Sequence, residues 1–73
     1  MSEQLSDEQL AEQLADAIVE LSPMVVGWEV DARTDTVQLT LPKRLRAGID
    51  LTHLRAGHVE HVARRVVKAV ERA

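Results

Sequence analysis

Three histidines close together in the sequence are the residues whose type and spacing could hold a metal ion. His58 and His61 stand three positions apart, which places them on one side of a helix, and His53 precedes them. Neutral imidazole is a common ligand of zinc and other transition metals. The same helical spacing puts His61 among arginine and lysine side chains, whose charge opposes the binding of a cation. We therefore expect solvated surface histidines, and we predict no metal site and no cofactor.

Other side chains that could carry out catalysis are scarce. The chain has no cysteine and no tyrosine, so it offers no thiol nucleophile and no disulfide. The serines stand in a terminal segment, before a predicted helix and before a proline: Ser2, Ser6 and Ser22. The three glycines are too far apart to form a phosphate-binding loop. The sequence therefore predicts a binding protein and not an enzyme.

The charges are divided sharply between the two halves of the chain. Residues 1–32 hold eight Asp and Glu and no Lys or Arg, whereas residues 33–73 hold all nine Lys and Arg together with four Asp and Glu. The net charge of −3 hides this division. Such asymmetry indicates a polyanionic partner, or else two halves that neutralise each other within one chain or between subunits.

The small size makes a partner chain the expected source of additional stability. A domain of 73 residues buries only about 60% of the surface of its unfolded chain, so such domains usually need disulfides, a metal or a partner. We therefore expect a homo-oligomer, most simply a dimer. Apolar runs such as Met24-Val25-Val26 are far too short to span a membrane, and the first residues lack the features of a signal peptide. We expect no membrane contact and a cytoplasmic location.

Residues 6–21 are predicted to form an acidic helix, preceded by a flexible tail at residues 1–5. Ser6 and Gln9 have the spacing of a capping box. Apolar residues recur at helical spacing along one side, and acidic residues occupy the other: Glu8, Glu12, Asp16 and Glu20. Pro23 ends the helix, because the residue before a proline is disfavoured in the α region.

Residues 24–41 are predicted to form a β-hairpin. Hydrophobic residues alternate with a period of two in both halves of this segment: Val26, Trp28 and Val30, then Val37, Leu39 and Leu41. The short polar segment 31–35 between them suits a hairpin loop. Trp28, the only aromatic residue, is expected to anchor the core of the hairpin.

Residues 43–57 are predicted to form short turns or one helix, because Leu-Arg-Ala-Gly occurs at 45–48 and at 54–57 and suits a helical turn closed by glycine. Asp50 is a suitable N-cap for the second turn. Residues 58–72 are predicted to form a basic amphipathic helix. Its apolar side is expected to pack on the hairpin or to form an interface with another subunit: Val59, Val62, Val66 and Val70. The predicted fold is a small α+β single domain of order α-β-β-α, in which a β-hairpin is packed by the N- and C-terminal helices.

The second half of the chain has an alternating strand that ends in proline, an apolar pair four residues apart, and a glycine before the last helix: Thr36 to Pro42, Leu45 with Ile49, and Gly57. In this order it resembles the ribbon-helix-helix DNA-binding family. The resemblance implies that strands paired between two subunits enter the major groove and read bases through their outward side chains: Thr36, Gln38 and Thr40. It also implies phosphate contacts from Lys43, Arg44 and the helix start at His58.

Two functions remain open at this point. One is a dimeric regulator that binds duplex DNA, which the basic second half and the resemblance favour. The other is a protein–protein interaction module, such as an adaptor, an antitoxin-like neutraliser or an assembly subunit, with no nucleic-acid role. A single tryptophan argues against single-stranded nucleic acid, whose binding sites stack successive bases on several aromatic side chains.

Overall fold

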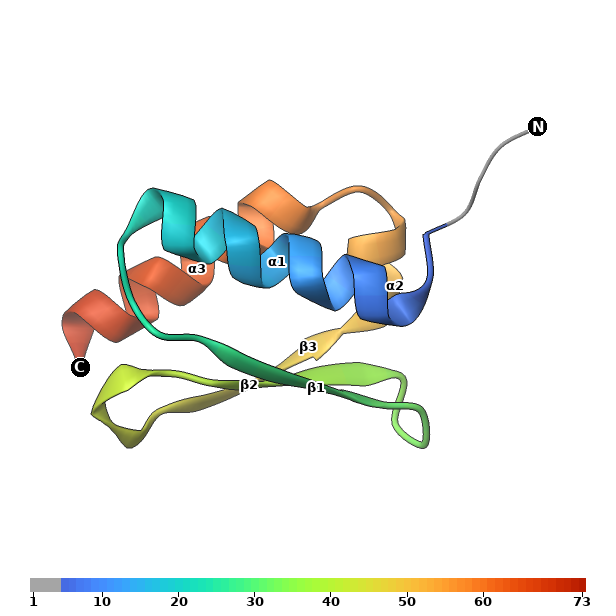
Figure 1. Cartoon of the computed structure of the whole chain (residues 1–73), viewed down its shortest axis with the longest axis horizontal. Helices are drawn as coiled ribbons and strands as arrows, with labels where there is room; N and C mark the ends of the chain where they lie inside the picture. The colour runs from blue at the N-terminus through green and yellow to red at the C-terminus, as the bar shows by residue number, and fades with distance from the viewer. Residues whose placement is uncertain (1–4) are drawn as a thin grey trace.

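The computed structural model describes residues 5–73, which form a three-stranded sheet covered on one face by helices (Figure 1). The elements follow in this order: α1 (Asp7–Leu21), β1 (Gly27–Asp31), β2 (Thr36–Thr40), a turn η1 (Pro42–Arg44), β3 (Arg46–Asp50), α2 (Leu51–Arg55) and α3 (Val59–Arg72). The sheet is antiparallel throughout, in the order β1-β2-β3. The predicted α+β fold, with a hairpin packed by the terminal helices, is confirmed. The predicted tail lies outside the described residues, except for Leu5.

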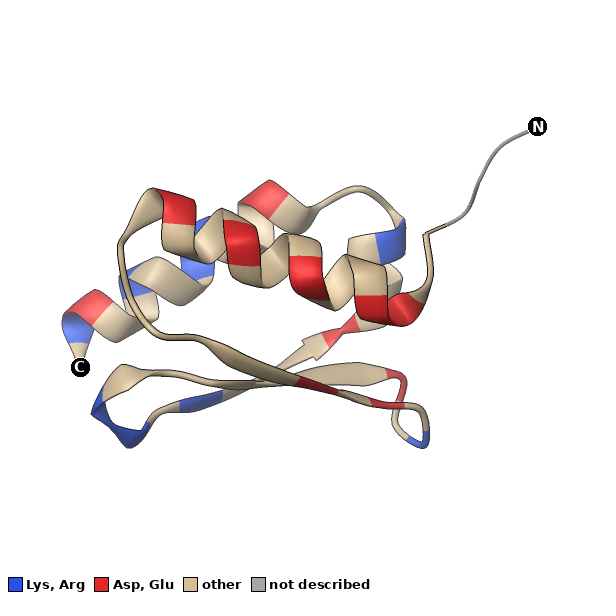
Figure 2. Cartoon of the chain, in the orientation of Figure 1, with Lys and Arg blue, Asp and Glu red and all other residues tan. Residues whose placement is uncertain are grey.

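Local sequence signals define both ends of helix α1. The Gln9 N–H donates to Ser6 Oγ at 3.2 Å, and the Ser6 N–H donates to Gln9 Oε1 at 2.9 Å, so the predicted capping box is present. Ser22 is extended and lies before Pro23, which ends the helix. Figure 2 shows acidic residues along the length of α1, and those of the predicted acidic side are exposed: Glu8, Glu12, Asp16 and Glu20. The predicted acidic helix is therefore confirmed.

The hairpin of β1 and β2 is also confirmed, but its tryptophan does not have the predicted role. Trp28 lies opposite Leu39 and Val30 lies opposite Val37, so these four side chains share the face that the helices cover. Leu39 and Val37 are buried. Trp28 is 37% exposed on β1, which is an edge strand of the sheet. The prediction that Trp28 anchors the core is wrong.

The segment predicted as turns or helix contains a third strand instead. Residues 46–50 pair with β2, so the prediction for residues 43–57 is wrong there. Ala47 and Ile49 point to the covered face beside Leu39 and Val37, but the small Ala47 and Gly48 obscure this period of two in the sequence. The second copy of Leu-Arg-Ala-Gly does close a helical turn.

Helix α2 has the signals expected at both of its ends. Gly57 follows it with a φ of 88°, the left-handed conformation expected of a C′ glycine. Asp50 is its N-cap and accepts a hydrogen bond from the Thr52 N–H at 2.9 Å. Both caps are as the sequence predicts.

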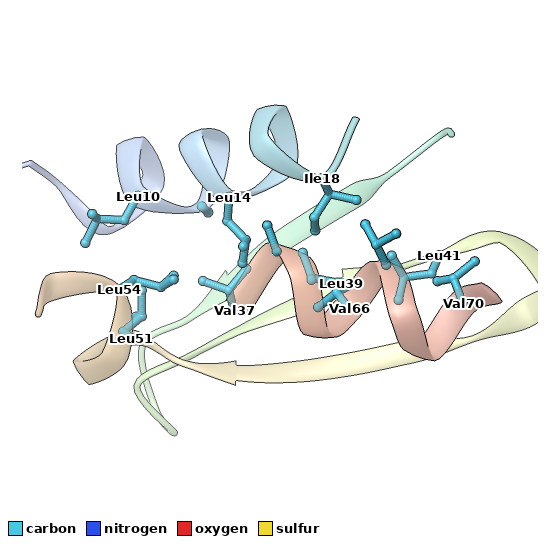
Figure 3. Close-up of a cluster of buried hydrophobic side chains, with 13 residues drawn as sticks. Leu10, Leu14, Ile18, Val37, Leu39, Leu41, Leu51, Leu54, Val66 and Val70 are labelled. Atoms are coloured by element: carbon cyan, nitrogen blue, oxygen red, sulfur yellow. The ribbon is translucent and has the colours of Figure 1, made fainter. Parts of the chain in front are cut away.

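The core lies between the covered face of the sheet and the apolar sides of the three helices (Figure 3). Its largest fully buried side chains come from α1, β2 and α2: Leu14, Ile18, Val37, Leu39, Leu51 and Leu54. Helix α1 contacts both α3 and β1, so the N-terminal and C-terminal helices pack against each other. Within residues 5–73, no helix has the length and apolar character needed to cross a membrane.

Candidate binding groove

A groove of about 910 Å³ lies between strand β3 and helix α3. Its lining is mainly apolar and comes from both elements and the turn before β3: Leu41, Leu45, Ala47, Ile49, Val62, Val66 and Ala69. Its rim carries charged and imidazole side chains: Arg46, Asp50, His53, His58, His61 and Arg65. An apolar hollow of this size with a few polar groups at its rim is typical of a binding site.

The apolar side of α3 is shared between the core and this groove. Val66 and Val70 are buried in the chain's own core, where α3 packs against α1. Val59 and Val62 are half-buried at its margin. Two of the four valines predicted to form an interface, Val66 and Val70, are therefore part of the chain's own core. Val62 and Val66 border the groove.

Strand β3 forms the floor of the groove and is an edge of the sheet; within residues 5–73 it pairs with β2 alone. Two backbone hydrogen bonds just outside the ends of β3 show which of its N–H and C=O groups point toward β2. The Leu41 N–H donates to the Leu45 carbonyl oxygen, and the Leu51 N–H donates to the Asp35 carbonyl oxygen, both at 2.9 Å. In an antiparallel ladder the bonded pairs recur at every second residue.

It follows that Ala47 and Ile49 are the β3 residues whose backbone groups bond to β2. The backbone N–H and C=O groups of Arg46 and Gly48 therefore point away from the sheet, toward its open edge. An edge of this kind is a template for pairing with another strand. Here it lies directly beside an apolar groove.

The groove's rim is mainly basic. His53, His58 and His61 all border it, as do Arg46 and Arg65. The structure thus brings the three histidines to one site, but among residues 5–73 no group of three His, Asp or Glu side chains could hold a metal ion.

One carboxylate, that of Asp50, stands among these basic groups. The backbone N–H of Thr52, 2.9 Å from Asp50 Oδ1, holds the pKa of this carboxyl group below its usual range. Asp50 therefore keeps its negative charge at neutral pH.

The predicted base readers lie in a row on the opposite, uncovered face of the sheet. Thr36, Gln38 and Thr40 occupy alternate positions of β2, the central strand. Gln38 donates from Nε2 to Thr36 Oγ1 at 3.1 Å, so part of its amide is already bonded within the strand. Because β2 is paired on both sides within the chain, it has no free edge for pairing with a second subunit.

Acidic side chains surround that row. Glu29 lies opposite Gln38, while Asp31 and Asp50 lie on either side of Thr36. Among the strand partners of this row in the described sheet, the cation is Arg46, opposite Thr40. This face therefore carries more negative than positive charge, which opposes contact with phosphates.

The residues predicted to contact phosphates do not form one cluster. Lys43 donates from Nζ to the carbonyl oxygens of Val70 and Ala73, both at 3.0 Å, so it binds the C-terminal end of α3. Arg44 is exposed in the same turn. His58 lies at the opposite end of α3, about 20 Å away along a helix of this length.

Comparison of the chain with protein-family models, with curated protein sequences and with solved structures gives no match.

Sequence reasoning missed the groove because it missed β3. The one available signal was the inward pair Ala47 and Ile49, which repeats the alternation of Val37 and Leu39 one strand away. It also missed the role of Lys43, whose partners lie 27 and 30 residues further along the chain.

Proposed function

We propose that this chain is a non-enzymatic protein–protein interaction module that binds a polypeptide in the groove between β3 and α3. The observation that carries the proposal is a strand edge beside an apolar groove, to which no other strand of the described part of the chain is paired. Free N–H and C=O groups in a regular row are best satisfied by another strand, and an adjoining apolar hollow can take that strand's side chains. As the sequence predicts, we place the module in the cytoplasm.

The groups that line the groove support binding rather than catalysis. They include imidazoles and one carboxylate, but none of the lining residues has a hydroxyl or thiol group that could act as a nucleophile. The apolar part of the lining is the larger part, and burying apolar surface is the main source of affinity in protein association.

Site-specific photocrosslinking in cells tests the proposal. A photoreactive phenylalanine analogue is placed at Ala69, which is exposed at the groove, or at Glu12, which is exposed on the outer side of α1. We expect a protein adduct from the Ala69 position and none from Glu12. The adduct's components are then identified by mass spectrometry and the purified components are tested for binding. Equal labelling at both positions, or no adduct at either, would contradict the proposal.

A second candidate function, binding of duplex DNA, rests on the exposed side of α3. This side carries a row of cations (Figure 2): Arg64, Arg65, Lys68 and Arg72. The Arg64–Glu60 pair, at 4.0 Å between two exposed side chains, neutralises little of this charge. A phosphate backbone would suit such a row better than it suits the acidic uncovered face of the sheet. In this alternative, α3 contacts the DNA. The predicted base readers do not contact it: Thr36, Gln38 and Thr40.

A further inference from the structure

We propose that the polypeptide bound in the groove is a second copy of this chain, whose β3 pairs antiparallel with the first β3 about a two-fold axis at Gly48. The two sheets would then form one sheet of six strands. This inference rests on the proposed function, because it names the partner of the same groove. Three features of β3 support it: backbone direction, charge order and side-chain size.

The backbone directions fit this register. In a two-fold pair centred on Gly48, the residues facing each other across the axis are Gly48 with its own copy, and Arg46 with Asp50. The N–H and C=O groups of Arg46 and Gly48 already point to the open edge. Pairing in this register would form about four backbone hydrogen bonds between the copies. A register shifted by one residue would instead set Gly48 opposite Ala47 or Ile49 of the second copy, whose backbone groups are already bonded to β2.

The charges of β3 are self-complementary in this register. Its sequence, Arg-Ala-Gly-Ile-Asp at 46–50, places a cation at one end and an anion at the other. Antiparallel pairing therefore sets Arg46 opposite Asp50 of the second copy, and the symmetry repeats that pair. Both side chains are exposed on the uncovered face, and opposite charges facing each other across strands stabilise a sheet.

The small side chains of β3 suit the same arrangement. Gly48 at the axis has no side chain that could block the approach of the second strand. On the covered face Ala47 would lie beside Ile49 of the second copy. The floors of the two grooves would then form one continuous surface. The apolar lining of both grooves would then be covered. Arg65 and His61 are exposed at the rim and can keep their polar ends in water.

The other edge of the sheet does not share these properties. In the matching two-fold pair of β1, centred on Val30, whose N–H points to the open edge, Glu29 would lie opposite Asp31 of the second copy at both ends. Like charges directly opposite each other destabilise paired strands. Self-pairing is therefore favoured at β3 and disfavoured at β1, which provides an internal control for the experiments that follow.

Complementary charge reversals test the register. Arg46→Glu sets two carboxylates opposite each other at both ends of the pair, and Asp50→Lys sets two cations there, so each variant alone should sediment as a monomer. A mixture of the two variants sets one carboxylate opposite one cation at both ends of the pair, so it should sediment at twice the monomer mass. Circular dichroism checks that Asp50→Lys, which loses the N-cap of α2, is folded. A mixture that stays monomeric beside a dimeric wild type would overturn the register.

A disulfide test does not depend on those variants. The natural chain has no cysteine, so one introduced cysteine can only form a disulfide between chains. Opposed Cα atoms in a bonded antiparallel pair are about 5.5 Å apart, within the range that a disulfide spans. Gly48→Cys should therefore crosslink rapidly into a dimer under mild oxidation. Gly27→Cys is the matched control, because Gly27 is the exposed glycine of the other edge strand. Equal rates for the two variants would overturn the proposal.

Failure of this inference is distinguishable from failure of the proposed function. A wild-type protein that is monomeric at all concentrations, together with an Ala69 adduct that contains a different protein, overturns self-pairing and leaves the interaction module in place. An adduct containing two copies of this chain supports both.

Discussion

The guanidinium group of Arg55 binds the carboxylate of Asp35 with two hydrogen bonds, from Nη1 to Oδ2 at 2.9 Å and from Nη2 to Oδ1 at 2.8 Å. Nη2 also donates to Asp7 Oδ1 at 2.9 Å. Arg55 thus connects α2 with the β1–β2 loop and with the first turn of α1. These partners lie 20 and 48 residues away along the chain. The basic and acidic halves of the sequence therefore meet within one chain at this point.

This ion pair predicts a particular dependence of stability on pH. Hydrogen bonds from Arg55 hold the pKa of Asp35 below its ordinary value of 3.8. A carboxyl group whose pKa is lower in the folded state stabilises the fold fully above the unfolded-state pKa. That contribution is lost as the pH falls through the folded-state pKa. We expect the free energy of unfolding to decrease below about pH 4 for this reason.

The variant Asp35→Asn tests this expectation, because asparagine tolerates the left-handed φ of 55° at this position. It should be less stable than the wild type at neutral pH and should lose less stability on acidification. Asp16→Asn, on the exposed side of α1, is the control and should keep the wild-type dependence. Urea unfolding across the acidic range measures both. An unchanged acid dependence in Asp35→Asn would show that this pair is not the cause.

The buried side chain of Leu14 should contribute strongly to stability. Leu14 is fully buried in the core between α1 and the sheet. Leu14→Ala should lower the free energy of unfolding by about 2–5 kcal/mol, because it removes buried apolar atoms and leaves a cavity. Val19→Ala, at a position on the same helix that is 42% exposed, should change it by less than about 0.5 kcal/mol. Urea unfolding at one fixed protein concentration compares them, and similar losses of stability for both would contradict this description of the core.

The turn between β2 and β3 should be strained at Arg44. Lys43 and Arg44 have φ values of 62° and 61°, a conformation that costs residues other than glycine about 1–2 kcal/mol. Arg44→Gly should therefore raise the free energy of unfolding, by up to about 1 kcal/mol after the added flexibility of the unfolded chain is included.

Lys43→Gly is the matched control for this prediction. It relieves the same backbone conformation and removes the same charge, but it also loses the two hydrogen bonds to the end of α3. It should gain less stability than Arg44→Gly or lose some. An Arg44→Gly protein less stable than the wild type would contradict the assignment of strain to this residue.

Binding of duplex DNA, the second candidate function, makes a prediction that separates the helix from the sheet. Fluorescence anisotropy with a mixed-sequence duplex measures affinity at several salt concentrations. Arg64→Gln combined with Lys68→Gln should weaken binding and make its salt dependence shallower, by about one in the log–log slope for each phosphate that is no longer neutralised. Gln38→Ala should bind as the wild type does. A larger drop in affinity for Gln38→Ala would instead support readout by β2, and no binding at low salt would remove this candidate.

The parts of the fold that the sequence predicts are those specified by neighbouring residues. The capping box of Ser6 and Gln9 and the stop at Pro23 define α1 locally. The C′ glycine Gly57 and the N-cap Asp50 do the same for α2. These signals act over a few residues, so they can be read without knowledge of the tertiary structure.

Strand β3 was not predictable in the same way. The turn before it uses Lys43 and Arg44 in a left-handed conformation, where the sequence offers no glycine as a signal. The strand contains alanine and glycine at two of its five positions, and it owes its structure to pairing with β2. The groove follows from β3 and from the position of α3 over it, which are long-range relationships.

Amide hydrogen exchange at Gly48 tests the central claim most directly, because this N–H points to the open edge of β3. It is measured by NMR in the purified protein over a range of concentrations, and again with any partner identified by crosslinking from Ala69. Val30 is the control, since the same alternation of bonds points its N–H to the open edge of β1. Protection of Gly48 in at least one of these samples, with Val30 exchanging rapidly in all, is the predicted result. Exchange at Gly48 as fast as at Val30 in every sample would contradict the claim that the edge of β3 is a binding edge.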